Sequence, residues 1–481
     1  MNTVDDLRVT FEQVTNVIQR SAALSEASVA GKVSEFWRDV FAERPNFPDL
    51  NQLMVFRREG FAYGIGDDRQ GSIERERVYS ERMYRIFSRM VDLDLVTKIP
   101  ESTFGAPLVF QHDGIERSAS FWINAATSQR VKDFVGRFGK RGPLRVLEIG
   151  AGWGACAYQL HRMMEIESYV IVDLPNNLHI SSIYLATTLP DQRTEIIDIA
   201  GGPVTDIAAN TIVGCLPATL PRLQTKFDLV LNSFSLQEMS LDTVKVYIDW
   251  IAGALTDDGL FVSLNSHGKA GVRLPSDYGY DKFHLHHWNV FRLNPSGFLN
   301  TIPYEVVAGR RRTGSPSYPS AAQDGLGGLM QLGLDRDLDA IGGALVNGSL
   351  DAGQTRMLDG YARFFAATSD ADRKAILDPL RSIDASAVWP YVGAHLALVQ
   401  DDKARCLDLL EEACRRDLAG FARIRANVLR AGLSRKRGSA DIPLEANGFD
   451  PVAAYPEVSA MIETGDISPM INQTNRILRR N

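Results

Sequence analysis

Cysteine is scarce in this chain of 481 residues, and the few cysteines are scattered along it. Only four occur, at Cys156, Cys215, Cys406 and Cys414, and no two of them form a CxxC pair. A zinc ribbon needs such pairs and a disulfide-stapled fold needs many more cysteines, so the sequence indicates neither. Reduced thiols are typical of the cytoplasm, which is the location that we predict.

Long apolar runs and an excess of positive charge are lacking as well. No stretch reaches the roughly 18 uncharged apolar residues that a membrane span requires. The first residues, MNTVDDLRVTFEQ, are acidic and lack an apolar core, which argues against a signal peptide. The net charge is −7 and the basic runs at 310–312 and 435–437 are short, so we expect neither a membrane nor a nucleic acid as a partner.

Apolar residues make up 45% of the chain, and their spacing divides it into parts. Residues 1–115 place them at intervals of three and four, which predicts a mainly helical cap that helps to bind the substrate. Residues 116–312 alternate short apolar runs with helical stretches, which predicts a doubly wound α/β domain. The Gly-, Ser- and Pro-rich residues 313–333 indicate a linker, and residues 334–481 a helical domain.

Six apolar runs are the expected strands of the α/β domain: LRVLEIG, SYVIVDL, NTIVGCL, FDLVLNS, LFVSLN and YEVVAGR. They lack polar alternation, which favours a parallel sheet covered on both faces. In the C-terminal part, Ala387–Ala413 resembles a single tetratricopeptide-like hairpin. An ordinary helical hairpin fits the same residues, so these helices leave open a homo-oligomer or a protein partner.

The run VLEIGAGWGACAYQL joins the first expected strand to a helix through Gly150, Gly152 and Gly154. Without side chains, such a loop turns sharply and approaches a ligand closely, and the helix that follows offers N–H groups. Glu148 ends the first strand, and Asp173 ends the second, where a carboxylate can accept hydrogen bonds from ribose hydroxyls. Because Glu148 would favour a cationic ligand, we predict S-adenosylmethionine as the cofactor.

Two other interpretations of this loop stay open. GAGWGA also satisfies the loose dinucleotide pattern G-x-G-x-x-G/A, which would make the protein an NAD-dependent oxidoreductase. Two features argue against that interpretation. Gly154 comes one position before the third glycine of a dinucleotide loop, and the end of the strand contains an acid, Glu148. A partner-binding protein with a non-catalytic α/β scaffold is the second alternative. A scaffold has no physical need for both acids and all three glycines together.

Four segments together resemble the sugar O-methyltransferase family of class I S-adenosylmethionine-dependent enzymes: LRVLEIGAGWGACAYQL, SYVIVDLP, FDLVLNSFSLQEM and LFVSLN. The glycine loop is common to class I enzymes, whereas the FSLQEM turn and the SLN strand end are more selective. The resemblance covers about residues 100–310 of the chain. It implies a Rossmann-like methyltransferase domain and a small-molecule or glycan acceptor, methylated on a hydroxyl of a sugar or glycosylated metabolite.

A sugar hydroxyl is a weak nucleophile, so methyl transfer to it needs a base or a metal. Glu238, in the turn after the fourth strand, is the first candidate base, although a carboxylate there would also suit a helix N-terminus. His267, after the fifth strand, is the second candidate, and a loop histidine without a role is its alternative. We expect Asn232 to contact the cofactor, and Gln237 and Asn265 to contact the substrate.

A histidine-rich segment, YDKFHLHHWNV, follows the fifth strand. Asp281, His284, His286 and His287 could supply ligands for a transition metal. In an extended strand, however, His287 faces the side opposite to His284 and His286, so we predict no metal. His284 and Trp288 are instead the remaining candidates for substrate contact, the latter by stacking on a sugar ring or, alternatively, as a core residue.

Overall fold

The computed structural model describes most of the chain, with gaps. The described residues are 4–25, 48–59, 72–88, 91–138, 141–265, the backbone of 288–294 and 304–310, and in the C-terminal part 359–360, 363–364, 367, 369–383, 386–416, 418, 420–434 and 471. Two compact units are distinguished, residues 1–277 with 307–310, and residues 278–306 with 311–481. The linker expected at 313–333 lies outside the described residues.

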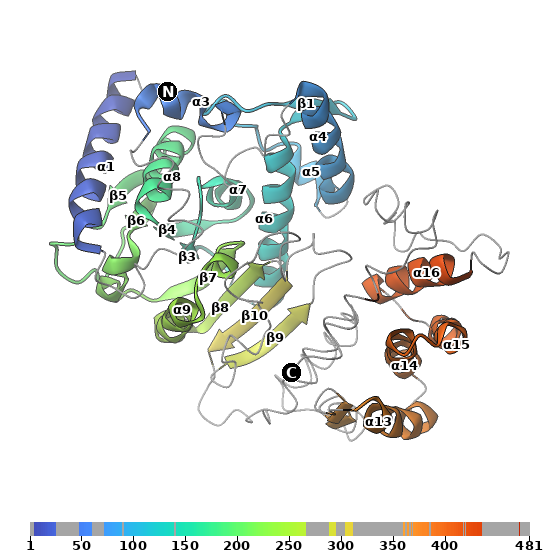
Figure 1. Cartoon of the computed structure of the whole chain (residues 1–481). Helices are drawn as coiled ribbons and strands as arrows, with labels where there is room; N and C mark the ends of the chain where they lie inside the picture. Colours follow the sequence, from blue (N-terminus) through green and yellow to red (C-terminus); the bar gives the residue numbers. More distant parts are fainter. Residues whose placement is uncertain are drawn as a thin grey trace. The chain divides into compact units, whose positions relative to one another are not determined.

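One eight-stranded sheet organises the α/β part of the chain (Figure 1). Its strand order is β5-β6-β4-β3-β7-β8-β10-β9, and the pairings from β5 through β8 are all parallel. The strands are β3 (Leu144–Ile149), β4 (Ile166–Val172), β5 (Arg193–Ile196), β6 (Thr211–Cys215), β7 (Phe227–Ser233), β8 (Leu255–Asn265), β9 (Trp288–Asn294) and β10 (Tyr304–Arg310). The predicted α/β class and all six predicted strands are confirmed.

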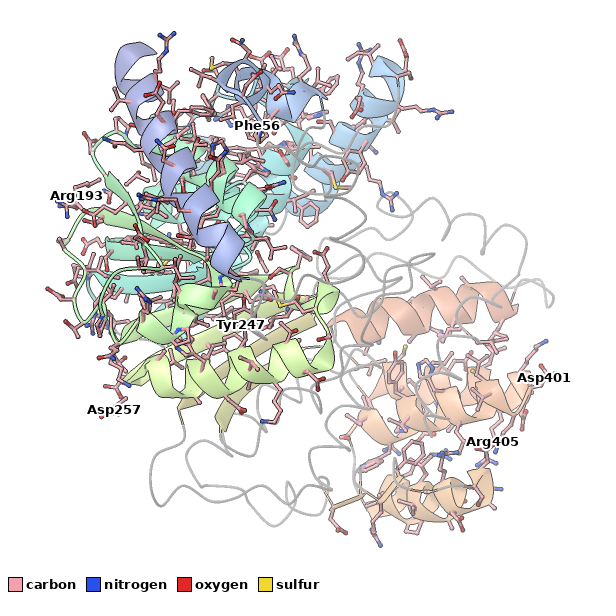
Figure 2. All side chains as sticks on the ribbon, turned by 60° about the vertical axis from the view of Figure 1, so that its left-hand side comes forward. Phe56, Arg193, Tyr247, Asp257, Asp401 and Arg405 are labelled. Carbon is pink, nitrogen blue, oxygen red and sulfur yellow. The ribbon has the colours of Figure 1, made fainter. Side chains whose placement is uncertain are left out.

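Two strands of the sheet were not predicted, β5 and β9. Strand β5 is short, and its residues alternate between exposed and half-buried, because it forms the edge of the sheet. Its Arg193 is exposed and forms an ion pair with Glu195 at 2.7 Å (Figure 2). A charged, short edge strand protects the sheet from pairing with other chains, but its sequence lacks the apolar run by which a buried strand is found.

Helices connect the parallel strands and cover the sheet. They are α6 (Ala119–Phe138), α7 (Ala155–Met163), α8 (Pro175–Thr188) and α9 (Leu241–Ala254), with 3-10 turns η3 (Pro217–Arg222) and η4 (Leu236–Glu238). From β3 the chain runs through β4 to the edge strand β5, returns to β6 between β5 and β4, and then continues to β7 on the other side of β3. This reversal is a topological switch point, and such sheets bind ligands in the crevice at the carboxyl ends of the strands there.

The N-terminal helices pack on this domain. They are α1 (Val4–Ser25), α3 (Leu50–Glu59), α4 (Ile73–Phe87) and α5 (Leu93–Val96), followed by a hairpin of β1 (Phe110–His112) and β2 (Ile115–Arg117). Helix α1 lies along α8, and α4 packs on α6. Among the helices that the structure describes, none has the length and apolar character of a membrane span.

The part of the chain from residue 359 on forms helices over most of its described residues. It contains α13 (Asp370–Ile383), α14 (Val388–Val399), α15 (Lys403–Arg415) and α16 (Gly420–Ser434), which pack in consecutive pairs. The hairpin expected at Ala387–Ala413 is present as α14 and α15. Trp389 and Ala413 are buried in it, and Leu409 of α15 lies against Gly393 of α14.

Helix α1 is fixed on α8 through a buried histidine. His179 Nε2 lies 2.8 Å from Thr15 Oγ1, and the ring of Phe11 meets the His179 ring edge-on with centroids 5.2 Å apart. Burial lowers the pKa of His179 to about 4, because the charged imidazolium would lose its hydration there. The neutral histidine is therefore part of the packing between the two helices.

This burial makes the stability of the protein depend on pH. Between pH 6.5 and 4 the unfolded chain protonates His179 while the folded chain does not, so the free energy of unfolding falls as the pH drops through this window. We expect the difference in unfolding free energy between wild type and His179→Gln, measured in urea, to shrink by about 2 kcal/mol from pH 7.5 to pH 5. An unchanged difference would contradict the buried neutral histidine.

Candidate functional site

The loop after the central strand β3 has an unusual backbone. Gly150, Gly152 and Gly154 have φ values of 73°, 60° and 90°, in the left-handed region that residues with a side chain rarely adopt. A Cβ atom added at Gly150 would lie 2.0 Å from Ser235 Oγ, so space as well as conformation excludes a larger residue. Gly150 N also donates a hydrogen bond to Val172 O at 2.7 Å, which ties the loop to the end of β4.

Asp173 directly follows β4 and joins the end of this strand to the glycine loop. Its carboxylate Oδ2 accepts a hydrogen bond from Gly152 N at 2.8 Å. Its Oδ1 accepts from Leu174 N at 2.7 Å and from Asn177 Nδ2 at 3.1 Å. Burial raises the pKa of Asp173 to about 6, although these three hydrogen bonds favour the ionised form. The predicted acid therefore lies beside the glycine loop, and a carboxylate oxygen with one donor can accept a second.

Glu148 lies beneath the loop rather than at its surface. It is fully buried in β3, and its Oε2 accepts a hydrogen bond from the hydroxyl of Tyr169 on β4 at 2.7 Å. Its Oε1 has no hydrogen-bond partner among the described residues. Burial raises the pKa of Glu148 to about 7, the Tyr169 hydrogen bond opposes this shift, and the nearby charge of Asp173 adds to it.

A polar network closes the carboxyl ends of β3, β7 and β8. Asn232 Nδ2 donates to Ile149 O at 2.8 Å and to Ser235 Oγ at 2.5 Å. Asn265 Nδ2 donates to Asn232 Oδ1 at 2.9 Å and to Ser263 Oγ at 2.7 Å. The structure thus brings the two predicted asparagines together, but both side chains are fully buried and hydrogen-bonded within the protein. Their hydrogen bonds link the three strand ends to one another.

Two residues at this rim were missed by the sequence analysis. Ser235 packs against Gly150 and donates to Ile149 O at 3.0 Å, which only the pairing of β3 with β7 makes possible. Phe234, which precedes it, has a φ of 58° and donates its N–H to Leu264 O at 2.7 Å. A left-handed phenylalanine costs about 1–3 kcal/mol and tends to occur at functional sites. Phe234 is therefore a further candidate residue of the functional site.

The other predicted site residues are only partly described. Glu238 lies half-buried in η4, before the capping residue Ser240 of α9, so it is not in the first turn of that helix. The side chain of Gln237, in the same turn, is not among those described. His267 and His284 lie outside the described residues, as do Asp281, His286 and His287, and only the backbone of Trp288 is described, at the start of β9.

Within the described ranges, no group of three or more His, Cys, Asp or Glu side chains is placed to hold a metal ion. The cysteine at the start of α7 does not lie in surroundings that would activate its thiol. Cys156 is buried beside Ser128, with Sγ and Oγ 3.4 Å apart. Burial raises its pKa well above the usual value, so Cys156 is a packing residue at the base of the loop.

Comparison with known proteins gives matches only among solved structures. No family model matches the chain, and neither does any curated protein. Magnesium protoporphyrin IX methyltransferase from Synechocystis PCC 6803 with bound SAH is 11% identical, covers 53% of this chain and 96% of its own, and has a TM-score of 0.32. Ribosomal protein L11 methylase from Lactobacillus delbrueckii subsp. bulgaricus is 14% identical, covering 42% of this chain and 90% of its own, with a TM-score of 0.27.

A third solved structure, mitomycin 7-O-methyltransferase, is 15% identical and has a TM-score of 0.25. The match covers 40% of this chain and 57% of the methyltransferase. Identities and TM-scores this low do not transfer a cofactor or a substrate to the present chain. The residues around the glycine loop determine the chemistry of the site.

The buried carboxyl group of Glu148 gives a test of the site's electrostatics. Between pH 4.5 and 7 the unfolded chain ionises Glu148 while the folded chain keeps its proton, so this group lowers the free energy of unfolding as the pH rises. We expect Glu148→Gln to gain roughly 2 kcal/mol of stability relative to wild type between pH 5 and pH 8 in urea unfolding. A difference that does not change with pH would mean that Glu148 is already ionised at pH 5.

Proposed function

We propose that the protein is an S-adenosylmethionine-dependent methyltransferase that binds its cofactor over the glycine loop between β3 and α7. The observation that carries the proposal is the position of Asp173, whose carboxylate lies 2.8 Å from Gly152 N at the topological switch point of the sheet. This placement leaves an acid at the end of β4 for ribose hydroxyls, next to a loop whose three glycines have no side chains to obstruct a ligand.

The residues beneath the loop suit the cationic part of this cofactor. Glu148 Oε1 is buried without a partner, and such a group is costly unless a donor or a positive charge approaches it. A positive charge above the loop would favour the ionised form of Glu148 through space and so lower its raised pKa. The left-handed glycines would let the loop backbone approach the amino acid part of the ligand.

The strand order supports this proposal over a dinucleotide enzyme. Dinucleotide-binding domains have the strand order 3-2-1-4-5-6, counted from the first strand of that domain. On the far side of the switch point their strands 4, 5 and 6 therefore lie side by side in chain order. Here β10 lies between β8 and β9, so the last two strands are exchanged. Together with the early position of Gly154, this order favours the methyltransferase over an NAD-dependent oxidoreductase.

We further propose a hydroxyl of a sugar or glycosylated metabolite as the acceptor, which rests on the resemblance of FSLQEM and SLN to sugar O-methyltransferases. The bound cofactor supplies a methyl group on a positively charged sulfur. As the acceptor oxygen bonds to this methyl carbon and the carbon–sulfur bond breaks, a base must take the hydroxyl proton. Glu238 follows β7 at the same edge of the sheet as the glycine loop, so it is the base that we propose, with His267 as the alternative.

Cofactor binding is tested by titrating S-adenosylhomocysteine (SAH) into the protein in a calorimeter. We expect Asp173→Asn to weaken SAH binding about 10- to 100-fold, because hydrogen bonds to a charged acceptor contribute roughly 1.5–3 kcal/mol. The single amide oxygen can accept from Gly152 N or from Leu174 N and Asn177 Nδ2 but not from both sides, so the expected loss includes the weakened link to the loop. A folded wild-type protein that binds no SAH would overturn the proposed function.

Asp228→Asn is the matched control for this titration. Asp228 is also a buried carboxylate and also binds a backbone N–H, that of Arg145 at 3.0 Å, but it lies near the amino end of β7. We expect its SAH affinity to stay within about twofold of wild type, since the ligand should bind at the opposite edge of the sheet. Equal losses in both variants would point to a general effect on folding.

The acceptor is tested with methyl-labelled cofactor and a panel of nucleotide sugars and glycans. We expect label on a sugar hydroxyl, and Glu238→Gln should lower kcat by about 10²- to 10⁴-fold while the SAH affinity is kept. Methylation of only a protein or a nucleic acid would refute the sugar acceptor. An unchanged kcat in Glu238→Gln would remove Glu238 as the base.

A further inference from the structure

The glycine loop contains one large side chain, Trp153, and the structure encloses it in protein. The residue is 4% exposed. It meets the ring of Tyr184 on α8 edge-on at a centroid distance of 4.8 Å and that of Phe56 on α3 at 5.7 Å. Trp153 stands between Gly152, whose N–H binds Asp173, and Gly154, the capping residue of α7. Whatever fixes this ring also fixes the backbone of the loop.

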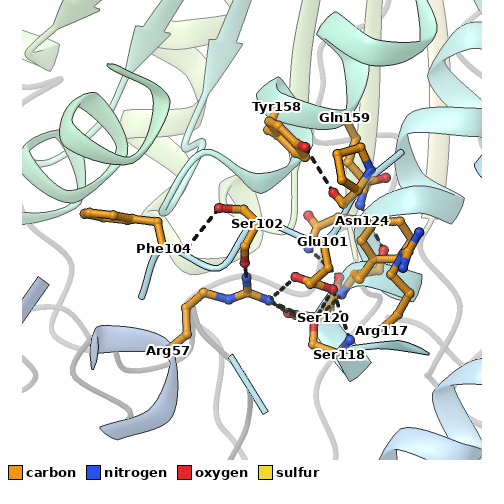
Figure 3. Close-up of polar contacts among 12 residues, drawn as sticks. Arg57, Glu101, Ser102, Phe104, Arg117, Ser118, Ser120, Asn124, Tyr158 and Gln159 are labelled. Atoms are coloured by element: carbon orange, nitrogen blue, oxygen red, sulfur yellow. Dashed lines mark hydrogen bonds and ion pairs between the residues drawn. The ribbon is translucent and has the colours of Figure 1, made fainter. Parts of the chain in front are cut away.

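A buried cation lies over this ring. The guanidinium carbon of Arg57 on α3 is 4.5 Å from the centre of the Trp153 ring, and the Arg57 side chain is fully buried. Arg57 forms an ion pair with Glu101 at 2.8 Å (Figure 3). Its guanidinium also donates to Ser118 Oγ at 2.8 Å, Ser120 Oγ at 3.1 Å and Ser102 O at 3.2 Å.

The partners of Arg57 are themselves anchored. Glu101 Oε2 accepts hydrogen bonds from the backbone N–H of Ser118 at 3.0 Å and from its hydroxyl at 3.1 Å, just before α6 begins. Arg57 N donates to Gly105 O at 3.0 Å, which holds the backbone of α3 against the segment that follows Ser102. The guanidinium therefore connects α3, residues 101–102 and residues 118–120 to the ring of Trp153.

Stability alone does not call for a charged pair here. Burying an arginine and a glutamate costs several kcal/mol, and their attraction often only offsets this cost, so apolar residues of similar volume can stabilise a core equally well. A guanidinium differs from apolar groups in its geometry, since its planar fork of donors fixes its orientation and its face stacks on an aromatic ring. What Arg57 adds is a defined position for the Trp153 ring.

We propose that Arg57 is a positioning residue for the cofactor site: through Trp153, it holds the glycine loop in the conformation that binds the cofactor. The proposal rests on the proposed function for the identity of the ligand, but the contact between Arg57 and the loop does not depend on it. The segments around Arg57 and Glu101, which lie far from the loop in the sequence, then set the affinity for the cofactor.

Arg57→Lys tests this role while it keeps the charge. A lysine cannot provide the planar stacking and forked hydrogen bonds of Arg57. In protein without ligand, we expect amide hydrogen exchange in residues 150–156 to be at least tenfold faster than in wild type, while exchange in the strands of the sheet stays the same. We also expect SAH to bind about tenfold more weakly.

Arg117→Lys is the matched control, because Arg117 also lies over an aromatic ring, that of Phe121 at 4.9 Å, and donates to the carbonyl oxygens of Thr97 and Ile99. None of these contacts reaches the glycine loop. We expect loop exchange and SAH affinity in this variant to remain within about twofold of wild type. A comparable loss in both variants would show a general loss of packing and would overturn the assignment to Arg57.

Trp153→Phe tests the same contact from the loop, and it serves if Arg57→Lys does not fold. We expect faster exchange in residues 150–156 here too, and a double variant that is no worse than the poorer single one, because both changes remove one interaction. Normal loop exchange in a folded Arg57→Lys or Trp153→Phe protein would refute the proposal, whether or not SAH binds. If exchange rises as expected but wild type binds no SAH, the proposed function fails and the positioning of the loop stands.

Discussion

The left-handed backbone at Gly150, Gly152 and Gly154 determines how the neighbouring groups of the site are arranged. Three such residues at alternate positions turn the chain from the end of β3 into the start of α7 within five residues. Because this conformation is available to glycine at little steric cost, the loop presents backbone where other loops present side chains. The neighbouring groups are arranged around that backbone: Asp173 accepts from Gly152 N, and Ser235 fills the space beside Gly150.

Support for the loop comes from several distant parts of the chain. The carboxyl ends of β7 and β8 contribute the buried network of Asn232, Ser235 and Asn265, which bonds to the last carbonyl of β3. The N-terminal region contributes Arg57, whose guanidinium lies over Trp153. The three glycines have no side chains with which to pack, so the shape of the loop depends on contacts of this kind. The N-terminal helices are in this sense part of the site as well as its surroundings.

The sequence predicted what depends on local pattern. Buried parallel strands read as apolar runs, and alternate glycines between a strand and a helix read as a ligand loop, so both could be located. It did not predict what depends on tertiary contacts. Nothing in the sequence near Arg57 indicates its partner 96 residues later, Trp153. Glu148 was expected to face the ligand, yet the structure buries it against Tyr169, because that partner comes from the neighbouring strand.

The proposed function requires that an adenosyl amino acid binds across the glycine loop with its ribose on Asp173. A crystal structure of the protein with SAH would show where the ribose lies. We expect ribose hydroxyls within about 3 Å of Asp173 Oδ2, and the amino acid part of SAH against the backbone of Gly150–Gly152. SAH bound elsewhere in the molecule, or a ribose turned away from Asp173, would contradict this binding mode.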